Sequence, residues 1–383
     1  MARLLAPLAA ALSASATVLA EGFFPHSPRP SDPTSSAQVF TLTLLTDAVN
    51  EGAVSLDGSP AAYYLFEGAE KNKWYIHQQG GGWCSSDDDC LSRSKGALGS
   101  TKGLKPTETI DGGYFSSDPA VNPLMWNFSK IFLPYTDGGS QTGDLTEPVK
   151  VGNSTIYYRG HRILNAMISA LKARALNTAT EVIVSGCSAG GLATFLHADE
   201  WGAALPNAKV TAMPDSGFFL DYNATANKGY GSLMRWVFSA MNSSGGVPAA
   251  CIAANSDDPA RCIFAEHVVP YSKVPLFPLQ SKYDSWQIGN DLDNKTPAAI
   301  NAWGTKLRGL VEENLLGPTR LNGVFLDSCN HHCGEWGITI DGQPTALAHQ
   351  QWYRTLSVSG SKKEWNQNGT TPAYPCASCC KIA

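Results

Sequence analysis

The feature that most constrains the fold is a segment in which a strand pattern turns directly into a helix pattern around a serine. Residues 181–185 are rich in β-branched side chains, and residues 192–201 have the composition of a helix. Between them lies Gly186-Cys-Ser188-Ala-Gly190, a Gly-x-Ser-x-Gly sequence. Small residues around a serine permit the tight, strained turn called a nucleophile elbow. The segment therefore predicts a sheet that presents Ser188 above its edge.

The rest of the chain alternates between strand and helix patterns. We expect strands at 40–46, 61–66, 74–79, 130–135, 208–213, 275–280 and 321–327, and helices at 157–176, 231–241, 298–315 and 344–357. Strands that alternate with helices are typical of a mostly parallel sheet. The prediction is an α/β fold whose mostly parallel central sheet is covered by helices on both faces.

Composition excludes several classes of protein. The 383 residues are 43% hydrophobic and only 16% charged, which is too apolar and too weakly charged for a disordered chain. The net charge of −5 lacks the basic excess of a nucleic-acid binder. We expect a signal peptide at 1–20, a flexible Pro- and Ser-rich lead-in at 21–37, and a single domain at 38–383.

The N-terminal residues predict export. Arg3 precedes an apolar stretch at 4–12, small residues follow it, and Val18-Leu19-Ala20 offers a cleavage site. A membrane anchor is the alternative, but Pro7 interrupts the stretch, and no other segment approaches the ~20 apolar residues of a membrane span. The 10 cysteines fit an oxidising compartment. Sequons for glycosylation occur at Asn127, Asn153, Asn223, Asn242, Asn294 and Asn368.

A serine hydroxyl needs a base and an orienting acid to act as a nucleophile. Where a nucleophile elbow lies in a parallel sheet, the order along the chain is serine, acid, histidine, each after a later strand. Asp284 follows the expected strand at 275–280, and His332 follows the one at 321–327. We expect Asp284 to orient His332, and His332 to act as the base for Ser188.

Neighbouring residues compete for these roles. His331 stands beside His332, and spacing alone does not separate the two. Asp215 and Asp327 are competing acids. Asp327 is close in sequence to both histidines, and Asp215 comes soon after the nucleophile strand.

A second glycine cluster, Gly80-Gly-Gly82-Trp83, follows the expected strand at 74–79. Glycines let backbone N–H groups turn toward a ligand where a Cβ would obstruct them. Gly82, Trp83 and Ala189 are the candidate donors to an oxyanion. A phosphate-binding loop is the alternative, but no Lys-Ser/Thr pair follows the glycines.

The cysteines suggest disulfides more than metal binding. We expect bridges between Cys84 and Cys90 and between Cys251 and Cys262, a C-terminus stapled by its own cysteines, and a Cys187 that is buried and reduced. The C-terminal cysteines are Cys376, Cys379 and Cys380. Zinc ligation by Cys329-Asn-His-His-Cys333 is the alternative, but no second ligand pair stands at the usual spacing. We expect no metal and no cofactor.

The chain resembles the pectin acetylesterase family, which also includes the Notum carboxylesterases. The matching motifs run in order over most of the chain: GGGWC at 80–84, DGGYFSSDPAVNP at 111–123, YRGHRI at 158–163, SGCSAGGL at 185–192, YDSWQI at 283–288 and DSCNHHC at 327–333. The resemblance implies an α/β-hydrolase-like fold, a secreted serine esterase and the triad Ser188, Asp284 and His332. It also implies an oxyanion site around Gly82, Trp83 and Ala189.

Three positions depart from the family pattern. Thr136 stands where members typically have a cysteine, Gln79 stands where an acidic residue is common, and His331 is unusual beside His332. None of these departures removes a triad member.

Three functions follow from this reading. The first is a secreted, monomeric esterase that removes O-acetyl groups from a cell-wall polysaccharide such as pectin. The second is a Notum-like lipid carboxylesterase, which needs a deep apolar acyl pocket where acetyl needs a shallow one. The third is a non-catalytic binding protein, which the complete Ser-Asp-His set disfavours. Tryptophans near the motifs are candidate sugar platforms or core residues: Trp83, Trp126, Trp236, Trp286 and Trp336.

Overall fold

The computed structural model describes residues 38–223, 229–317, 321–334, 336–367 and 374–375. The expected signal peptide at 1–20 and lead-in at 21–37 therefore lie outside the described residues. Within the described ranges, no helix is long and apolar enough to cross a membrane.

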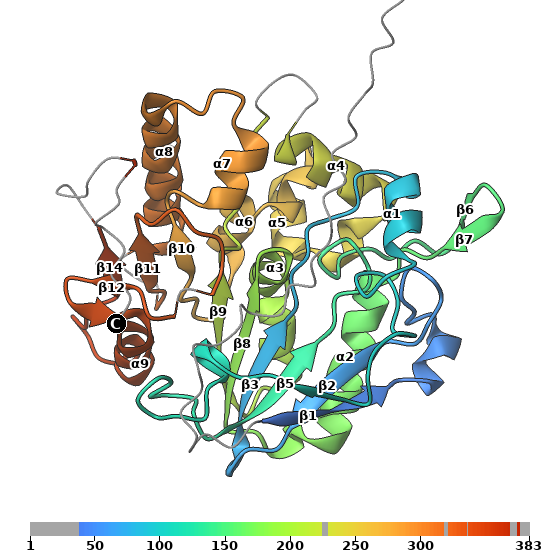
Figure 1. The fold of residues 1–383 in the computed structure, drawn as a ribbon, viewed down its shortest axis with the longest axis horizontal. Helices are drawn as coiled ribbons and strands as arrows, with labels where there is room; N and C mark the ends of the chain where they lie inside the picture. Colours follow the sequence, from blue (N-terminus) through green and yellow to red (C-terminus); the bar gives the residue numbers. More distant parts are fainter. Residues whose placement is uncertain (1–37, 224–228, 318–320, 335, 368–373, 376–383) are drawn as a thin grey trace, which may run out of the picture.

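A ten-stranded sheet in the order β14-β11-β10-β9-β8-β3-β5-β2-β1-β4 runs through the described part of the chain (Figure 1). All neighbours from β14 to β5 are parallel, and β2, β1 and β4 extend the sheet in antiparallel fashion. The strands are β1 Val39–Leu44, β2 Ala62–Phe66, β3 Glu70–Gln78, β4 Thr107–Thr109, β5 Phe128–Leu133, β8 Glu181–Cys187, β9 Lys209–Asp215, β10 Leu279–Ser281, β11 Val324–Asp327 and β14 Glu364–Asn366.

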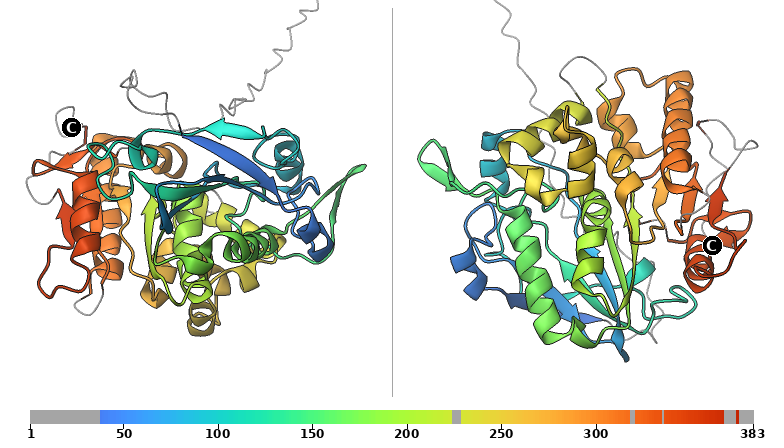
Figure 2. Two further views of the ribbon diagram at one scale, coloured as in Figure 1. Left: turned by 90° about the horizontal axis from the view of Figure 1, so that it is seen from below. Right: turned by 180° about the vertical axis from the view of Figure 1, so that it is seen from behind.

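Side chains alternate between the two faces of the sheet, and each face has its own core. On β3, Trp74 and Ile76 pack into one buried cluster, and Tyr75 between them packs into the other. The first cluster includes residues of four helices that cover the rear face (Figure 2): α2 Gly160–Arg174, α3 Ala189–Ala204, α4 Tyr230–Ala240 and α8 Pro297–Leu315. The second is covered by α9 Thr345–Arg354 and by connecting segments, among them the short 3-10 helix Gly113–Phe115 with its buried Tyr114 and Phe115.

The predicted α/β fold with a mostly parallel sheet is confirmed, and each expected strand and helix is present within a few residues of its predicted bounds. The second face is covered less by helices than we expected, since aromatic side chains of irregular chain fill much of it. Several short elements were not predicted. Two are the outermost strands of the sheet, β4 and β14. The others are the helices α1 Asp87–Arg93, α5 Ala249–Ala254, α6 Ala265–Val268 and α7 Ser285–Asp291, and the small hairpins β6 Val149–Val151 with β7 Ser154–Ile156 and β12 Thr339–Ile340 with β13 Gln343–Pro344.

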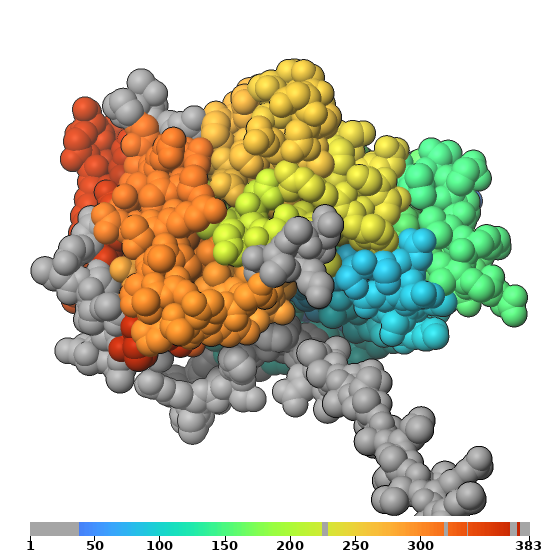
Figure 3. All heavy atoms as spheres, turned by 90° about the horizontal axis from the view of Figure 1, so that it is seen from above, coloured from blue at the N-terminus to red at the C-terminus, as the bar shows by residue number. Residues whose placement is uncertain are grey.

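The parallel strands bring distant parts of the chain to one edge of the sheet. Strands β3, β8, β10 and β11 all end at the upper edge in Figure 1. Figure 3 looks onto that edge, with α1 and the β6–β7 hairpin on one side and the orange segment of α7 and α8 on the other. Residues that follow different parallel strands meet here, which is where ligands bind in open α/β sheets.

Helix α3 approaches β3 so closely that position 190, in its first turn, has room only for glycine. A Cβ on Gly190 would lie 2.0 Å from the carbonyl oxygen of Gln78. We expect Gly190→Ala to lower the free energy of unfolding by ~2 kcal/mol or more, because backbone must shift to accept the methyl group. Chemical denaturation measures the effect.

Gly289 provides the matched control. It is an exposed glycine of α7, and a Cβ there would meet nothing within 4 Å. Gly289→Ala is expected to be neutral or to stabilise the protein by up to ~1 kcal/mol, since alanine is the better helix former. Equal effects of the two substitutions would contradict the close approach of α3 to β3.

Candidate active site

Ser188 lies at a strained turn between β8 and α3. Strand β8 ends at Cys187, α3 begins at Ala189, and Ser188 between them has φ 59° and ψ −122°. A positive φ is unfavourable for a residue with a side chain and is typical of functional sites. Gly186 allows the turn, because a Cβ there would lie 2.3 Å from the carbonyl oxygen of Gly190. The elbow that the sequence predicts is therefore formed.

The structure brings Asp284 and His332 together. Asp284 follows β10, is fully buried, and caps α7 by accepting a hydrogen bond from the backbone N–H of Gln287 at 2.9 Å. Its other carboxylate oxygen lies 2.7 Å from Nδ1 of His332. The Nε2 of His332 is buried and makes no hydrogen bond to a described residue. A carboxylate on Nδ1 favours the tautomer whose Nε2 can accept a proton.

The competing residues have other partners. His331 lies against Asp327, with Nε2 3.1 and 3.2 Å from the two carboxylate oxygens. Asp215 accepts hydrogen bonds from the N–H of Gly334 and the hydroxyl of Ser216. Geometry thus separates the two histidines where spacing did not, since Asp284 pairs with His332 and Asp327 pairs with His331.

A disulfide joins the nucleophile turn to the histidine loop. Cys187, next to Ser188, is bonded to Cys333, next to His332, across a sequence separation of 146. The expectation that Cys187 is reduced is therefore wrong. The two loops follow β8 and β11, which are far apart in the sequence but end at the same edge of the sheet, so the two cysteines can meet.

The other cysteine predictions have mixed outcomes. The bridges Cys84–Cys90 and Cys251–Cys262 are confirmed. The C-terminal cysteines, from Cys376 onward, lie outside the described residues. Both cysteines of the suggested zinc motif, Cys329 and Cys333, are disulfide-bonded, so neither offers a thiolate to a metal.

The glycine loop after β3 lies against the elbow. A Cβ on Gly80 would come within 2.3 Å of the Cys187 carbonyl oxygen and 3.0 Å of Cβ of Ser188. Gly82 has φ +68° and faces open space, because a Cβ there would meet nothing within 4 Å. Arg93 of α1 donates a hydrogen bond to the carbonyl oxygen of Gly81 at 2.8 Å and so anchors the loop. The loop has the backbone freedom and the position expected of an oxyanion site.

The buried loop around Ser140, which the sequence did not indicate as part of the site, contacts both the glycine loop and the nucleophile elbow. The indole N–H of Trp83 donates to the hydroxyl of Ser140 at 2.7 Å, and that hydroxyl donates to the carbonyl oxygen of Ala189 at 2.8 Å. His197 lies 3.0 Å from the Ser140 carbonyl oxygen. Ser140 has φ 51°, and the only sequence signal for the loop is its pair of glycines before Ser140.

A cluster of aromatic rings packs beside His332. Trp83 packs against Phe219, Tyr230 and Trp286 with ring centroids 5.0 to 5.7 Å apart. Phe219 and Trp286 lie 6.0 and 6.4 Å from the ring of His332. Of the five tryptophans considered as sugar platforms, Trp83 and Trp286 thus lie at the site. Trp236 packs against Tyr158, Trp336 packs into the opposite core, and Trp126 is exposed.

Two departures from the family pattern have local explanations. Thr136 is buried, and its hydroxyl accepts a hydrogen bond from the hydroxyl of Ser55 at 2.9 Å. Gln79 accepts a hydrogen bond from the N–H of Tyr135 at 3.0 Å. Each polar side chain therefore has a partner beside the glycine loop.

The fold and the site together define a carboxylic ester hydrolase of the α/β-hydrolase type. The profile of the family described as Pectinacetylesterase matches residues 34–381. The chain belongs to this family.

Characterised relatives come from plants and animals. Pectin acetylesterase 11 of Arabidopsis thaliana is 33% identical over 88% of this chain and 94% of its own length. Pectin acetylesterase 7 of the same plant is also 33% identical, over 82% of this chain and 87% of its own length. The palmitoleoyl-protein carboxylesterase notum1a of Danio rerio is 26% identical over 85% of this chain and 67% of its own length.

Asp291, at the end of α7, is a buried acid beside this site. Neither of its carboxylate oxygens makes an ordinary hydrogen bond to a described residue, and the buried hydroxyl of Tyr230 likewise has no partner there. Burial raises the pKa of Asp291 from 3.8 to about 8; the backbone N–H of Tyr230 opposes this rise, and the charge of Asp284 adds to it.

The raised pKa of Asp291 predicts a pH-dependent stability. Between pH 4 and pH 8 the folded protein holds this proton and the unfolded chain has released it, so the free energy of unfolding falls as pH rises through this window. Asp291→Asn removes the ionisation. We expect its stability relative to wild type to improve by ~1 kcal/mol or more between pH 5 and pH 8, because one pKa unit corresponds to about 1.4 kcal/mol.

Chemical denaturation of both proteins at several pH values measures this difference in the free energy of unfolding. Asp293→Asn is the control, because Asp293 is exposed two residues further along the chain and carries the same charge. A wild-type protein that loses no stability relative to Asp291→Asn as pH rises would contradict the burial of a protonated Asp291.

Removal of the Cys187–Cys333 bridge is expected to lower both the stability of the protein and its turnover. Replacing both cysteines by alanine opens a 146-residue loop, which the chain-entropy model values at ~4–5 kcal/mol. We expect a lower melting temperature and a fall in kcat on a small acetyl ester of about tenfold or more, since small displacements of reacting groups cost this much.

Removal of the Cys251–Cys262 bridge is the matched control. Its cysteines are only 11 residues apart and are not adjacent to a candidate catalytic residue. We expect a smaller loss of stability and an unchanged kcat. Full activity without the Cys187–Cys333 bridge would show that the bridge does not position the site.

Proposed function

We propose that this protein is a secreted serine carboxylesterase that removes O-acetyl groups from a cell-wall polysaccharide, with pectin as its substrate. Ser188 is the nucleophile, His332 the general base and Asp284 the orienting acid. The observation that carries the proposal is the 2.7 Å contact between Asp284 and Nδ1 of His332, which leaves Nε2 without a partner among the described residues. Ser188 at the neighbouring elbow supplies the matching nucleophile.

The reaction proceeds in two acyl transfers. His332 takes the proton of the Ser188 hydroxyl as the oxygen attacks the ester carbonyl carbon. Backbone N–H groups of Gly82, Trp83 and Ala189 stabilise the negative charge that develops on the carbonyl oxygen. His332 then gives its proton to the departing sugar hydroxyl, and the acetyl group stays on Ser188.

Water completes the cycle. His332 takes a proton from water as the water oxygen attacks the acetyl carbon, and acetate leaves when Ser188 regains its proton. Only neutral His332 can act as a base in these steps. These residues supply the nucleophile, base and oxyanion donors that the two steps require.

The packing around His332 favours a small acyl group. Trp83, Phe219 and Tyr230 are at most 5% exposed and pack against one another, so their own rings occupy the space beside the histidine. A long lipid chain requires a deep open channel, whereas acetyl requires only a shallow site. This observation favours acetyl esters over the lipid-modified substrates for which the Notum relatives are named.

Sequence and relatives support the substrate and the location. The plant relatives are named as pectin acetylesterases. Three disulfides among the described residues fit an oxidising, extracellular compartment. We therefore infer export by the signal peptide at 1–20 and action in the cell wall, with residues 38–383 working as one monomeric esterase domain.

Acetate release from acetylated homogalacturonan tests the proposal. We expect wild type to release acetate and Ser188→Ala to lower kcat/KM by at least ~10⁴-fold, as loss of a serine nucleophile does in comparable triads. Asp284→Asn is expected to lower it by about 10⁴-fold, because the histidine then loses the tautomer it needs.

Parallel substrates separate the alternatives. Acetylated xylan tests the polymer, and p-nitrophenyl esters of increasing chain length test the acyl site, where activity is expected to be highest for acetate. Activity that survives in Ser188→Ala would overturn the mechanism. A preference for long acyl chains would favour a lipid carboxylesterase, and a folded wild type without esterase activity would favour a binding protein.

A further inference from the structure

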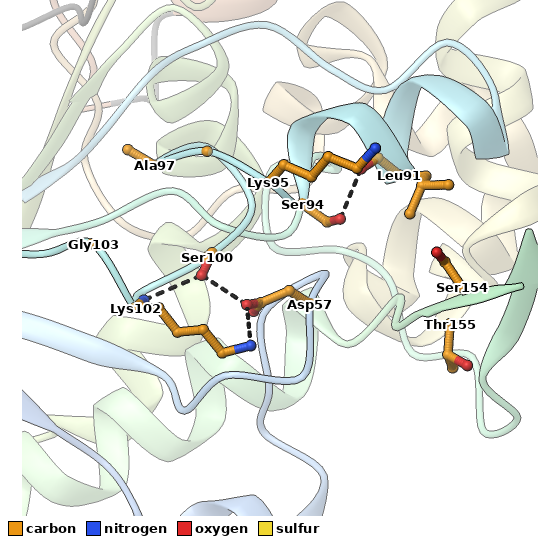
Figure 4. A pocket seen from close by; sticks show the side chains of 11 residues that line it. Asp57, Leu91, Ser94, Lys95, Ala97, Ser100, Lys102, Gly103, Ser154 and Thr155 are labelled. Atoms are coloured by element: carbon orange, nitrogen blue, oxygen red, sulfur yellow. Dashed lines mark hydrogen bonds and ion pairs between the residues drawn. The ribbon is translucent and has the colours of Figure 1, made fainter.

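An open pocket of about 550 Å³ lies beside α1 and the loop that follows it (Figure 4). Its size falls within the range of small-ligand sites. Three separate segments form it: the loop before β2, the end of α1 with the loop that follows, and strand β7. It is lined by Asp57, Leu91, Ser94, Lys95, Gly96, Ala97, Ser100, Lys102, Gly103, Ser154 and Thr155.

The charge available in the pocket is positive. Lys95 is exposed and forms no ion pair with a described residue. Lys102 lies 2.9 Å from the carboxylate of Asp57, but its side chain is 71% exposed. Asp57 is already occupied, because it also accepts hydrogen bonds from Ser100 and from the backbone N–H of Ser59. The single acid therefore anchors Lys102 and leaves both ammonium groups open to a ligand anion.

Residues with hydroxyl groups line the other side of the pocket. Figure 4 shows Ser154 and Thr155 on β7, across from Lys95 in the loop that follows α1. Lys150 adds a third positive charge next to them, since its Nζ lies 2.7 Å from the hydroxyl of Thr155. No aromatic side chain is among the described lining residues, so the pocket lacks the flat platform that a neutral sugar ring would stack on. Lysines and hydroxyls suit a ligand with carboxylates and alcohols.

The pocket is physically connected to the candidate oxyanion site. Its lining loop contains Leu98, whose side chain lies so close to Gly81 that a Cβ on that glycine would be 2.7 Å from it. Arg93, which immediately precedes the lining residue Ser94, holds the Gly81 carbonyl oxygen. The loop that lines the pocket therefore packs directly against the glycine loop beside Ser188.

We propose that this pocket binds a uronate residue of an acidic polysaccharide, away from the ester that reacts. Lys95 and Lys102 hold the carboxylate, and Ser154 and Thr155 bind ring hydroxyls. The inference rests on the proposed function and specifies how an enzyme with a net charge of −5 holds an anionic polymer. The uronate carboxylates of the polysaccharide, and not only its acetyl groups, are then part of substrate recognition.

The test uses the double variant Lys95→Gln/Lys102→Gln in the full-length protein. Native gel electrophoresis through unacetylated polygalacturonate measures binding without any need for catalysis. We expect wild type to be retarded, and the double variant to bind about tenfold more weakly, because two charge-assisted contacts are lost. Steady-state kinetics should show a matching rise in KM on acetylated homogalacturonan, with p-nitrophenyl acetate hydrolysis unchanged.

The control is Lys71→Gln/Lys172→Gln, which removes the same two charges elsewhere. Lys71 is the second residue of β3, at the opposite edge of the sheet, and it is ion-paired and 64% exposed, much like Lys102. Lys172 lies in the last turn of α2. The control should bind like wild type. Both double variants also carry Asn153→Gln, which removes the glycosylation sequon of the β6–β7 hairpin, so that no glycan there can block the pocket.

The outcomes separate this inference from the proposed function. Equal binding by the double variant and the control, or no retardation of wild type, would overturn the pocket assignment even if acetate release from pectin is normal. Lysine-dependent binding without acetate release would support the pocket and overturn the proposed reaction. An equal rise in KM on neutral acetylated xylan would also contradict recognition of a uronate.

Discussion

The arrangement of the whole site depends on the strained backbone at Ser188. A side-chain-bearing residue at φ 59° costs of order 1–3 kcal/mol and persists only where its surroundings hold it. Here the backbone N–H of Ser188 donates to the carbonyl oxygen of Asp215 at 3.0 Å, and Gly186 and Gly190 let strand and helix meet at van der Waals limits. The strain sets the serine above the sheet edge, where the loops that follow three other strands converge.

Those loops are tied to the elbow by bonds of different kinds. The histidine loop is joined to it covalently through Cys187 and Cys333, and the N–H of Cys333 donates to the hydroxyl of Ser216, which follows β9. The glycine loop is joined through Ser140, whose hydroxyl connects the Trp83 indole to the start of α3. The proposed reacting groups are therefore held relative to one another before a substrate arrives, which is the preorganisation that ester hydrolysis exploits.

How much the sequence alone can predict depends on whether a feature is local. The elbow was predictable because β-branched residues, three glycines and a serine lie within eleven positions, and the motif order placed Asp284 and His332 after later strands. The two histidines were not separable, since both follow the same strand and only the fold shows that His331 meets Asp327 four residues away.

Non-local features escaped prediction for the same reason. The partner of Cys187 lies 146 residues along the chain, so no spacing rule suggests it. The buried loop around Ser140 depends on a φ of 51° at this residue, a backbone conformation that serine does not favour. The short helix α7 was missed because its seven residues are too few for a periodic pattern, although Asp284 is a good N-cap residue.

The central claim is that Ser188 is an activated nucleophile, and active-site labelling tests it most directly. The enzyme is treated with one equivalent of an organophosphate ester, digested and analysed by mass spectrometry. The account predicts one phosphoryl group on the peptide that contains Ser188, formed far more slowly in His332→Ala. Labelling at another residue, or a rate at Ser188 that does not depend on His332, would contradict it.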